Sequence, residues 1–162
     1  MLDNAGELYE AVGRVVVPAA MLEQALETLA YAALGANDEA LRRVHGLPIG
    51  RVRALIETEA NMQASEWWSV PALSLLEDVD EPLTARNQVV HGHWVELRGL
   101  DQASSFVTLK PDRKSLQWKG QFLNPDQLVQ LAETLESLRE KAQRLADTLV
   151  EERHKHLGTG TP

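Results

Sequence analysis

The sequence contains no cysteine, only 5% aromatic residues and no hydrophobic run near the ~20 residues that a membrane-spanning helix needs. The absence of cysteine excludes disulfide bonds, thiol catalysis and cysteine-based metal sites. Met1–Asn4 lack the basic start and the apolar stretch of a signal peptide, so we expect a cytoplasmic protein without membrane association. The 162 residues, 44% hydrophobic and 25% charged, are typical of one soluble globular domain.

Basic residues are also scarce. The chain has 16 lysines and arginines against 24 aspartates and glutamates, a net charge of −8. This balance opposes tight binding to bulk nucleic acid, although it does not exclude a small basic site. The motifs of phosphate-binding glycine-rich loops, of serine hydrolases and of zinc proteases are absent from the sequence. We therefore expect an activity that needs no cofactor.

The sequence is rich in helical periodicity. Apolar residues recur three and four positions apart, and Pro18 is expected to kink or separate the first two helical segments. The adjacent Trp67 and Trp68 are expected to divide between surface and core. A leucine seam in the last helix, from Leu128 to Leu149, is interpreted as core or as a dimer interface. The predicted helices cover 8–16, 22–33, 39–45, 49–62, 82–91 and a final segment from 125 onward, with a turn or two of helix at 72–77.

The segment between the last two predicted helices has a residue pattern typical of β-strands rather than of a helix. Residues 94–98, 105–110 and 115–121 are short, β-prone and partly alternating, which predicts a β-hairpin or a small meander. The predicted fold class is therefore mainly α, a helical bundle with a small β insertion before the last helix. We expect a single domain at 1–153, with the β insertion at 94–123 and a disordered tail at 154–162.

The helix at 82–91 carries the polar residues of most interest. Arg86 falls inside its apolar arc, where an arginine costs free energy unless it is paired or serves a site. Asn87 and His91 lie four residues apart and are therefore neighbours on one edge of that arc. His93 follows directly after Gly92. An arginine and an imidazole without a nucleophilic side chain suit RNA cleavage, in which the ribose 2′-hydroxyl is the nucleophile.

The string Arg86-Asn87-Gln88-Val89-Val90-His91-Gly92 resembles the Arg-x(4–6)-His motif of the HEPN superfamily. The resemblance implies a HEPN-like helical bundle, commonly a homodimer, in which the motifs of two protomers meet in a cleft. Many such proteins are metal-independent endoribonucleases of toxin–antitoxin or defence systems. The resemblance implies that Arg86 and His91 are the catalytic pair, that Asn87 orients or contacts the phosphate and that His93 is auxiliary. An antitoxin or a regulatory protein is the implied partner besides RNA.

The β insertion is a locally basic region. Residues 94–124 hold five basic and three acidic side chains, a net charge of +2. Trp94, Arg98, Lys110 and Lys119 are therefore candidates for holding single-stranded RNA by stacking and by phosphate contact. The alternative is a hairpin whose aromatic side chains pack on the bundle.

Other interpretations of the same residues stay open. Arg86 could form a structural ion pair with Glu23 or Glu27, and His91 could simply bond the carbonyls of its helix end. His91 and His93, with His45, could also bind a metal. A non-catalytic HEPN-like module that binds a protein or a nucleotide is the second functional hypothesis.

Overall fold

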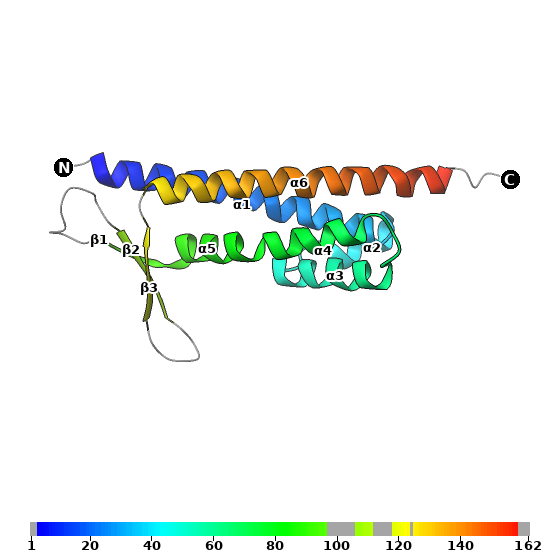
Figure 1. The fold of residues 1–162 in the computed structure, drawn as a ribbon, viewed down its shortest axis with the longest axis horizontal. Helices are drawn as coiled ribbons and strands as arrows, with labels where there is room; N and C mark the ends of the chain where they lie inside the picture. Colours follow the sequence, from blue (N-terminus) through cyan, green and yellow to red (C-terminus); the bar gives the residue numbers. More distant parts are fainter. Residues whose placement is uncertain (1–2, 97–105, 112–117, 124, 159–162) are drawn as a thin grey trace. The chain divides into compact units, whose positions relative to one another are not determined.

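The structure is a computed structural model that describes residues 3–96, 106–111, 118–123 and 125–158 (Figure 1). It is mainly helical, as the sequence predicts. Every helix in these residues is too short or too polar to cross a membrane. The described helices are α1 (Asp3–Ala33), α2 (Asp38–Val44), α3 (Ile49–Met62), α4 (Ser69–Asp78), α5 (Asp80–His91) and α6 (Pro125–Gly158).

The chain forms two compact units, within each of which the residues contact one another more than they contact the other unit. The first comprises Met1–Ala19 with Glu81–Leu135, and the second comprises Ala20–Asp80 with Glu136–Pro162. The long helices α1 and α6 therefore contribute to both units. Helix α6 also continues to Gly158, five residues beyond the end that the sequence predicts for the folded domain.

Helix α1 runs through Pro18 without a break. The sequence predicts that Pro18 either kinks the helix or separates two helices, and the separation is wrong. A proline inside a helix removes one backbone hydrogen bond, but packing of an apolar stripe can offset that loss. Such a stripe lies on both sides of Pro18, and its members are buried: Val15, Ala19, Leu22, Leu26 and Leu29.

The second unit contains α2, α3 and α4. The Asn37 side chain caps α2 by accepting a 2.9 Å hydrogen bond from the backbone N–H of Ala40. Helix α3 has the bounds that the sequence predicts. Trp68 is fully buried whereas Trp67 is 44% exposed, so the prediction that the pair divides between core and surface is confirmed.

Helix α6 is tied to the rest of the second unit by polar contacts. The indole Nε1 of Trp67 donates to Glu152, and Arg153 donates a 2.7 Å hydrogen bond to the side-chain oxygen of Gln63. Lys141 lies 3.5 Å from the carboxylate of Asp78. Contacts between residues as far apart as 63 and 153 hold the C-terminal part of α6 in this unit.

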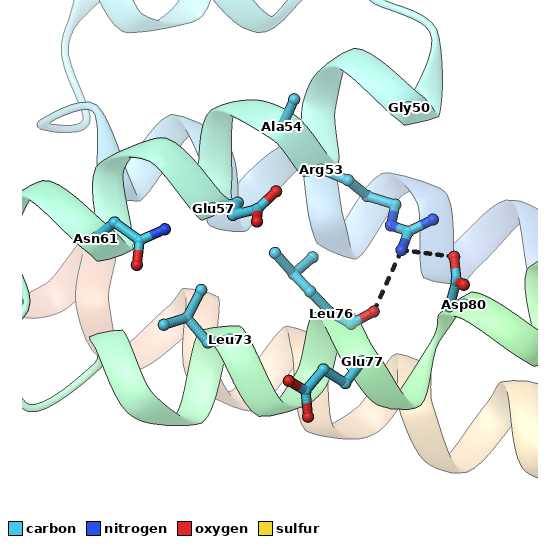
Figure 2. Close-up of a pocket in the computed structure, with 9 residues that line it drawn as sticks. All are labelled: Gly50, Arg53, Ala54, Glu57, Asn61, Leu73, Leu76, Glu77 and Asp80. Carbon is cyan, nitrogen blue, oxygen red and sulfur yellow. Dashed lines mark hydrogen bonds and ion pairs between the residues drawn. The ribbon is translucent and has the colours of Figure 1, made fainter.

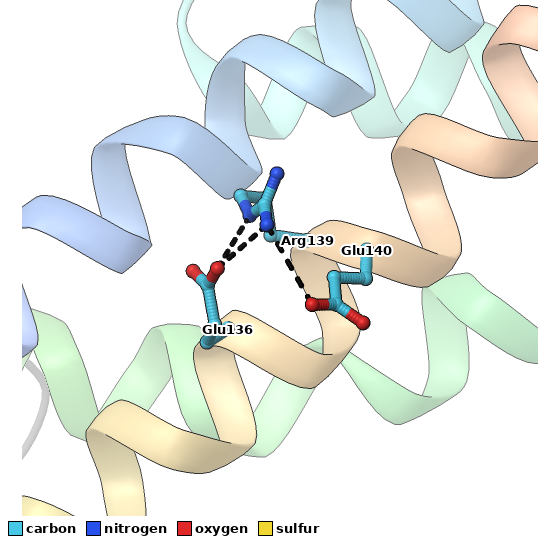
Figure 3. Close-up of polar contacts among 3 residues, drawn as sticks. All are labelled: Glu136, Arg139 and Glu140. Carbon is cyan, nitrogen blue, oxygen red and sulfur yellow. Dashed lines mark hydrogen bonds and ion pairs between the residues drawn. The ribbon is translucent and has the colours of Figure 1, made fainter.

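Within α6, Arg139 bridges two acidic residues (Figure 3). Its Nε and Nη2 both donate to one carboxylate oxygen of Glu136, at 3.0 and 2.6 Å, and Glu140 lies 3.8 Å away. The hydrogen bond with Glu136 is the main cause that raises the pKa of Arg139 above its ordinary value. The two carboxylates are 44% and 53% exposed and Arg139 is 23% exposed, so solvent screens the cluster and its contribution to stability is small.

The first unit contains α5 and a three-stranded antiparallel sheet. The strands are β1 (His93–Glu96), β2 (Phe106–Pro111) and β3 (Trp118–Leu123), in the spatial order β1-β2-β3 (Figure 1). Strand β1 begins two residues after the end of α5, so the sheet continues directly from the helix that carries the motif.

Candidate functional site

Helix α5 positions the candidate residues at its C-terminal end. The helix begins at Asp80, carries Pro82 in its first turn and ends at His91. The backbone N–H of Gly92 still donates a 2.9 Å hydrogen bond to the carbonyl of Gln88, which closes the last turn. Leu83 and Val89 are buried and hold the inner face of the helix. The remaining motif residues therefore lie on the edges and the outer face.

Arg86 and Asn87 are joined by a hydrogen bond. Nη1 of Arg86 donates to the side-chain oxygen of Asn87 at 2.9 Å. Both side chains are half-buried. The predicted apolar arc around Arg86 is only partly buried, because Val89 is 1% exposed whereas Val90 is 37% exposed. Arg86 thus lies at the boundary between core and solvent, where a guanidinium can reach an external anion.

His91 is exposed in the last turn of α5. It lies one turn beyond Asn87, as the four-residue spacing predicts. An exposed imidazole at a helix end can donate a hydrogen bond to a bound molecule or accept one from it. The structure therefore brings together, on one short helix, a guanidinium, a carboxamide that holds it and an accessible imidazole.

The other predicted residues lie on the sheet or outside the described residues. His93 and Trp94 are on β1, at the register positions of Leu109 and Thr108 on β2. Lys110 on β2 is the register partner of Lys119 on β3. Residues at such paired positions lie on the same face of a sheet. Arg98 falls outside the described residues.

A groove between α3 and α4 was not predicted (Figure 2). Its cavity volume is about 620 Å³, and Arg53 at one end donates to Asp80 at 2.8 Å and to the Leu76 carbonyl at 3.3 Å. The guanidinium is thus occupied by protein partners, and the exposed Glu57 and Glu77 make the groove acidic. A phosphate would be repelled there. The lining residues are Gly50, Arg53, Ala54, Glu57, Asn61, Leu73, Leu76, Glu77 and Asp80.

No local pattern signals this groove, because Arg53 and Asp80 lie on different helices and 27 residues apart. A neighbouring recess of about 480 Å³, which shares Ala54 of α3 with the groove, carries Arg43 and Arg51 beside the apolar Leu47 and Leu55. In the described part of the chain, no three histidine or acidic side chains gather as a metal site requires.

Compared with protein-family models, with curated proteins and with solved structures, the chain matches none of them.

Proposed function

We propose that this chain is a HEPN-type endoribonuclease that cleaves RNA without a metal ion, as a homodimer and in a toxin–antitoxin or defence system. The observation that carries the proposal is the arrangement on α5: Arg86 is hydrogen-bonded to Asn87, and the exposed His91 lies in the last turn. The mainly helical architecture is consistent with a helical bundle, whereas the sheet between α5 and α6 departs from the simplest bundle of that family.

The proposed reaction uses the RNA's own 2′-hydroxyl. His91 of one protomer takes the proton of this hydroxyl, whose oxygen attacks the adjacent phosphorus. The bond from phosphorus to the 5′-oxygen breaks, and His91 of the other protomer donates a proton to that oxygen. The products are a 2′,3′-cyclic phosphate and a free 5′-hydroxyl. Two protomers are needed because one imidazole cannot be base and acid in the same step.

The remaining residues stabilise charge and hold substrate in this proposal. The guanidinium of Arg86 binds the phosphate and stabilises the negative charge that develops on it. Asn87 positions that guanidinium through the observed hydrogen bond. His93, one glycine beyond His91, is auxiliary. Lys110 and Lys119, at opposed positions of β2 and β3, together with Trp94 and Arg98, would hold the RNA strand.

An RNA cleavage assay in excess EDTA tests the proposal. We expect the wild type to leave cyclic phosphates at 3′ ends, and His91→Ala and Arg86→Ala to lower the rate at least about 100-fold. His45→Ala is the matched control, because His45 is also an exposed histidine at a helix end but lies in the other unit. RNA with 2′-O-methyl groups should resist cleavage. Retained cleavage by His91→Ala would contradict the proposed role of the imidazole.

The second candidate function is a non-catalytic module that binds a protein or a nucleotide. It is favoured by the net charge of −8 and by the partial burial of Arg86 against Asn87, which fit a structural arginine. Under this hypothesis a broad pool of RNAs stays intact, and Arg86→Ala lowers the melting temperature while His91→Ala changes nothing.

A further inference from the structure

The recess of about 480 Å³ beside α3 combines two arginines with apolar side chains, and the proposed RNA cleavage uses none of them. The recess lies wholly within the second unit. One face of α3 forms much of its wall, because residues spaced by three and four positions share a helix face. The lining includes Arg43 of α2, Leu47 and Pro48 of the loop that follows it, and Arg51, Leu55 and Thr58 of α3.

The loop between α2 and α3 has a conformation fixed by its residues and by a hydrogen bond. Gly46 has a φ of +74°, a left-handed conformation that glycine adopts without strain. The backbone N–H of Leu47 donates a 3.1 Å hydrogen bond to the carbonyl of Val44. The ring of Pro48 restricts its φ, which is −59°. The recess is therefore pre-formed, and a ligand loses little affinity to the ordering of this loop.

The recess lies in a strongly basic part of an acidic chain. Residues 40–56 contain four arginines and no acidic residue, a charge of +4, whereas the whole chain has a net charge of −8. Arg53 is paired with Asp80. In the described part of the chain, the exposed Arg43 and Arg51 have no ion-pair partner. Their charges are therefore available to an external anion.

We propose that this recess binds a small amphipathic anion, a ligand with an apolar ring or chain that ends in one carboxylate or phosphate group. Arg43 and Arg51 bind the anionic group, because a planar guanidinium donates paired hydrogen bonds to either kind of oxyanion. The half-buried Leu47 and Leu55, with the ring of Pro48, contact the apolar body. The cavity volume lies within the range of about 300–1,000 Å³ that is usual for small-molecule sites.

The same residues discriminate between classes of ligand. The two guanidiniums repel a cation, and a neutral molecule makes no charge-assisted hydrogen bond with them. A nucleotide has a suitable phosphate, but its ribose would place polar hydroxyl groups against the leucines. Glu57 and Glu77 make the neighbouring groove acidic, so the anion is confined to the recess. The inference does not rest on RNA cleavage, because α5 from Glu81 onward belongs to the first unit.

NMR titration of the full chain with 2-naphthoate and with 2-naphthyl phosphate tests the proposal. We expect at least one of these acids to bind with a dissociation constant of about 0.1 to 1 mM. The largest shifts should occur at the backbone amides of Leu47 and Arg51. The tighter ligand of the two shows whether the preferred anionic group is a carboxylate or a phosphate. A chain that binds neither acid saturably below about 5 mM would overturn the inference.

Three further molecules test the ligand class. The neutral 2-naphthylmethanol and the cationic 2-naphthylmethylammonium keep the apolar body, whereas adenosine monophosphate keeps an anionic group on a polar body. Each should bind at least about tenfold more weakly than the better naphthyl acid. Equal binding of 2-naphthylmethanol would show that the arginines do not select the ligand. Tighter binding of adenosine monophosphate would show that the apolar residues do not select it. Either result would overturn the inference.

Replacement of the arginines tests their role. Arg43→Gln and Arg51→Gln should each raise the dissociation constant of the better naphthyl acid at least about fivefold. Arg42→Gln is the matched control, since Arg42 is the adjacent exposed arginine of α2 and does not line the recess. It should change the dissociation constant less than about twofold, because an exposed charge outside the site is screened. Equal losses in Arg42→Gln and Arg43→Gln would show a diffuse attraction and overturn the inference.

A negative charge added at the recess provides an independent test. Thr58 and Thr148 are exposed helical threonines whose hydroxyl groups donate to the carbonyl four residues earlier, at 2.7 and 2.8 Å. Thr58→Glu should weaken binding of the better naphthyl acid at least about fivefold, whereas Thr148→Glu should leave it unchanged. Glutamate is a good helix former, so both variants should stay folded. Equal binding by the two variants would overturn the inference.

Sedimentation of the same two variants shows whether a second copy of the chain covers the recess instead. Self-association of the wild type that Thr58→Glu abolishes and Thr148→Glu retains would identify a protein surface and overturn the inference. Self-association that is equal in both variants, with loss of the naphthyl acid only in Thr58→Glu, would support it.

Discussion

Arg86 donates a 2.9 Å hydrogen bond from Nη1 to the side-chain oxygen of Asn87, its neighbour in sequence. Consecutive residues of a helix project about 100° apart, so the long arginine side chain is needed for the guanidinium to reach Asn87 around the helix surface. The carboxamide then holds the guanidinium at the boundary between core and solvent. In the proposed nuclease Asn87 is therefore a positioning residue for Arg86.

Asn87→Ala should lower kcat about tenfold while KM changes less than about threefold, because the phosphate is still bound but the charge on the transition state is less well stabilised. Gln88→Ala is the matched control, since it removes a half-buried amide from the same helix. Steady-state kinetics on an RNA substrate measure both constants. Equal losses of kcat in the two variants would contradict a positioning role for Asn87.

The adjacent tryptophans should differ in their contribution to stability. Trp68 is fully buried, so Trp68→Ala should lower the free energy of unfolding by about 3–5 kcal/mol. Trp67 is 44% exposed and donates to Glu152, so Trp67→Ala should cost only about 1 kcal/mol. Urea unfolding of both variants measures the difference. Similar losses in the two variants would show that the burial of Trp68 is not what stabilises this unit.

Pro18→Ala should stabilise the chain by about 1–3 kcal/mol. Alanine restores the backbone hydrogen bond that a proline inside α1 cannot make, and it is the better helix former by about 3 kcal/mol in a helix interior. Some of this gain is offset by the loss of the half-buried proline ring. Thermal unfolding, with Ala20→Pro as the opposite change in the same helix, should show a rise for the first variant and a fall for the second. A fall for both would contradict the expectation.

The ion pair of Arg53 and Asp80 should contribute modestly to stability. Their side chains are 28% and 69% exposed, so solvent screens the pair, and Asp80→Asn should cost about 0.5–1 kcal/mol. Arg53→Met retains the aliphatic stem that packs in the groove and should cost about 1 kcal/mol or less. Glu10→Gln is the control, because the side chains of Arg14 and Glu10 are 59% and 65% exposed, and it should be near neutral. A loss of several kcal/mol for Asp80→Asn would show a strongly desolvated pair.

Local patterns predicted much of the helical structure. The bounds of α3 follow from its apolar periodicity, and Pro125 marks the start of α6 because proline fits the first helical turn. The helix that carries Arg86 and His91, and the position of His91 in its last turn, also follow from the spacing and from Gly92. These features depend on residues within one or two turns of each other, which the sequence displays directly.

Tertiary packing decided the rest. Only the buried stripe on both sides explains why α1 continues through Pro18, and only the fold decides that Trp68 rather than Trp67 is buried. Arg53 meets Asp80, and Gln63 meets Arg153, across 27 and 90 residues of chain. Local sequence patterns do not predict the spatial distance between such positions, because that distance depends on how the helices pack against each other. The amino-acid sequence by itself therefore determined the helices and their polar ends, whereas the packing of the helices determined which side chains meet.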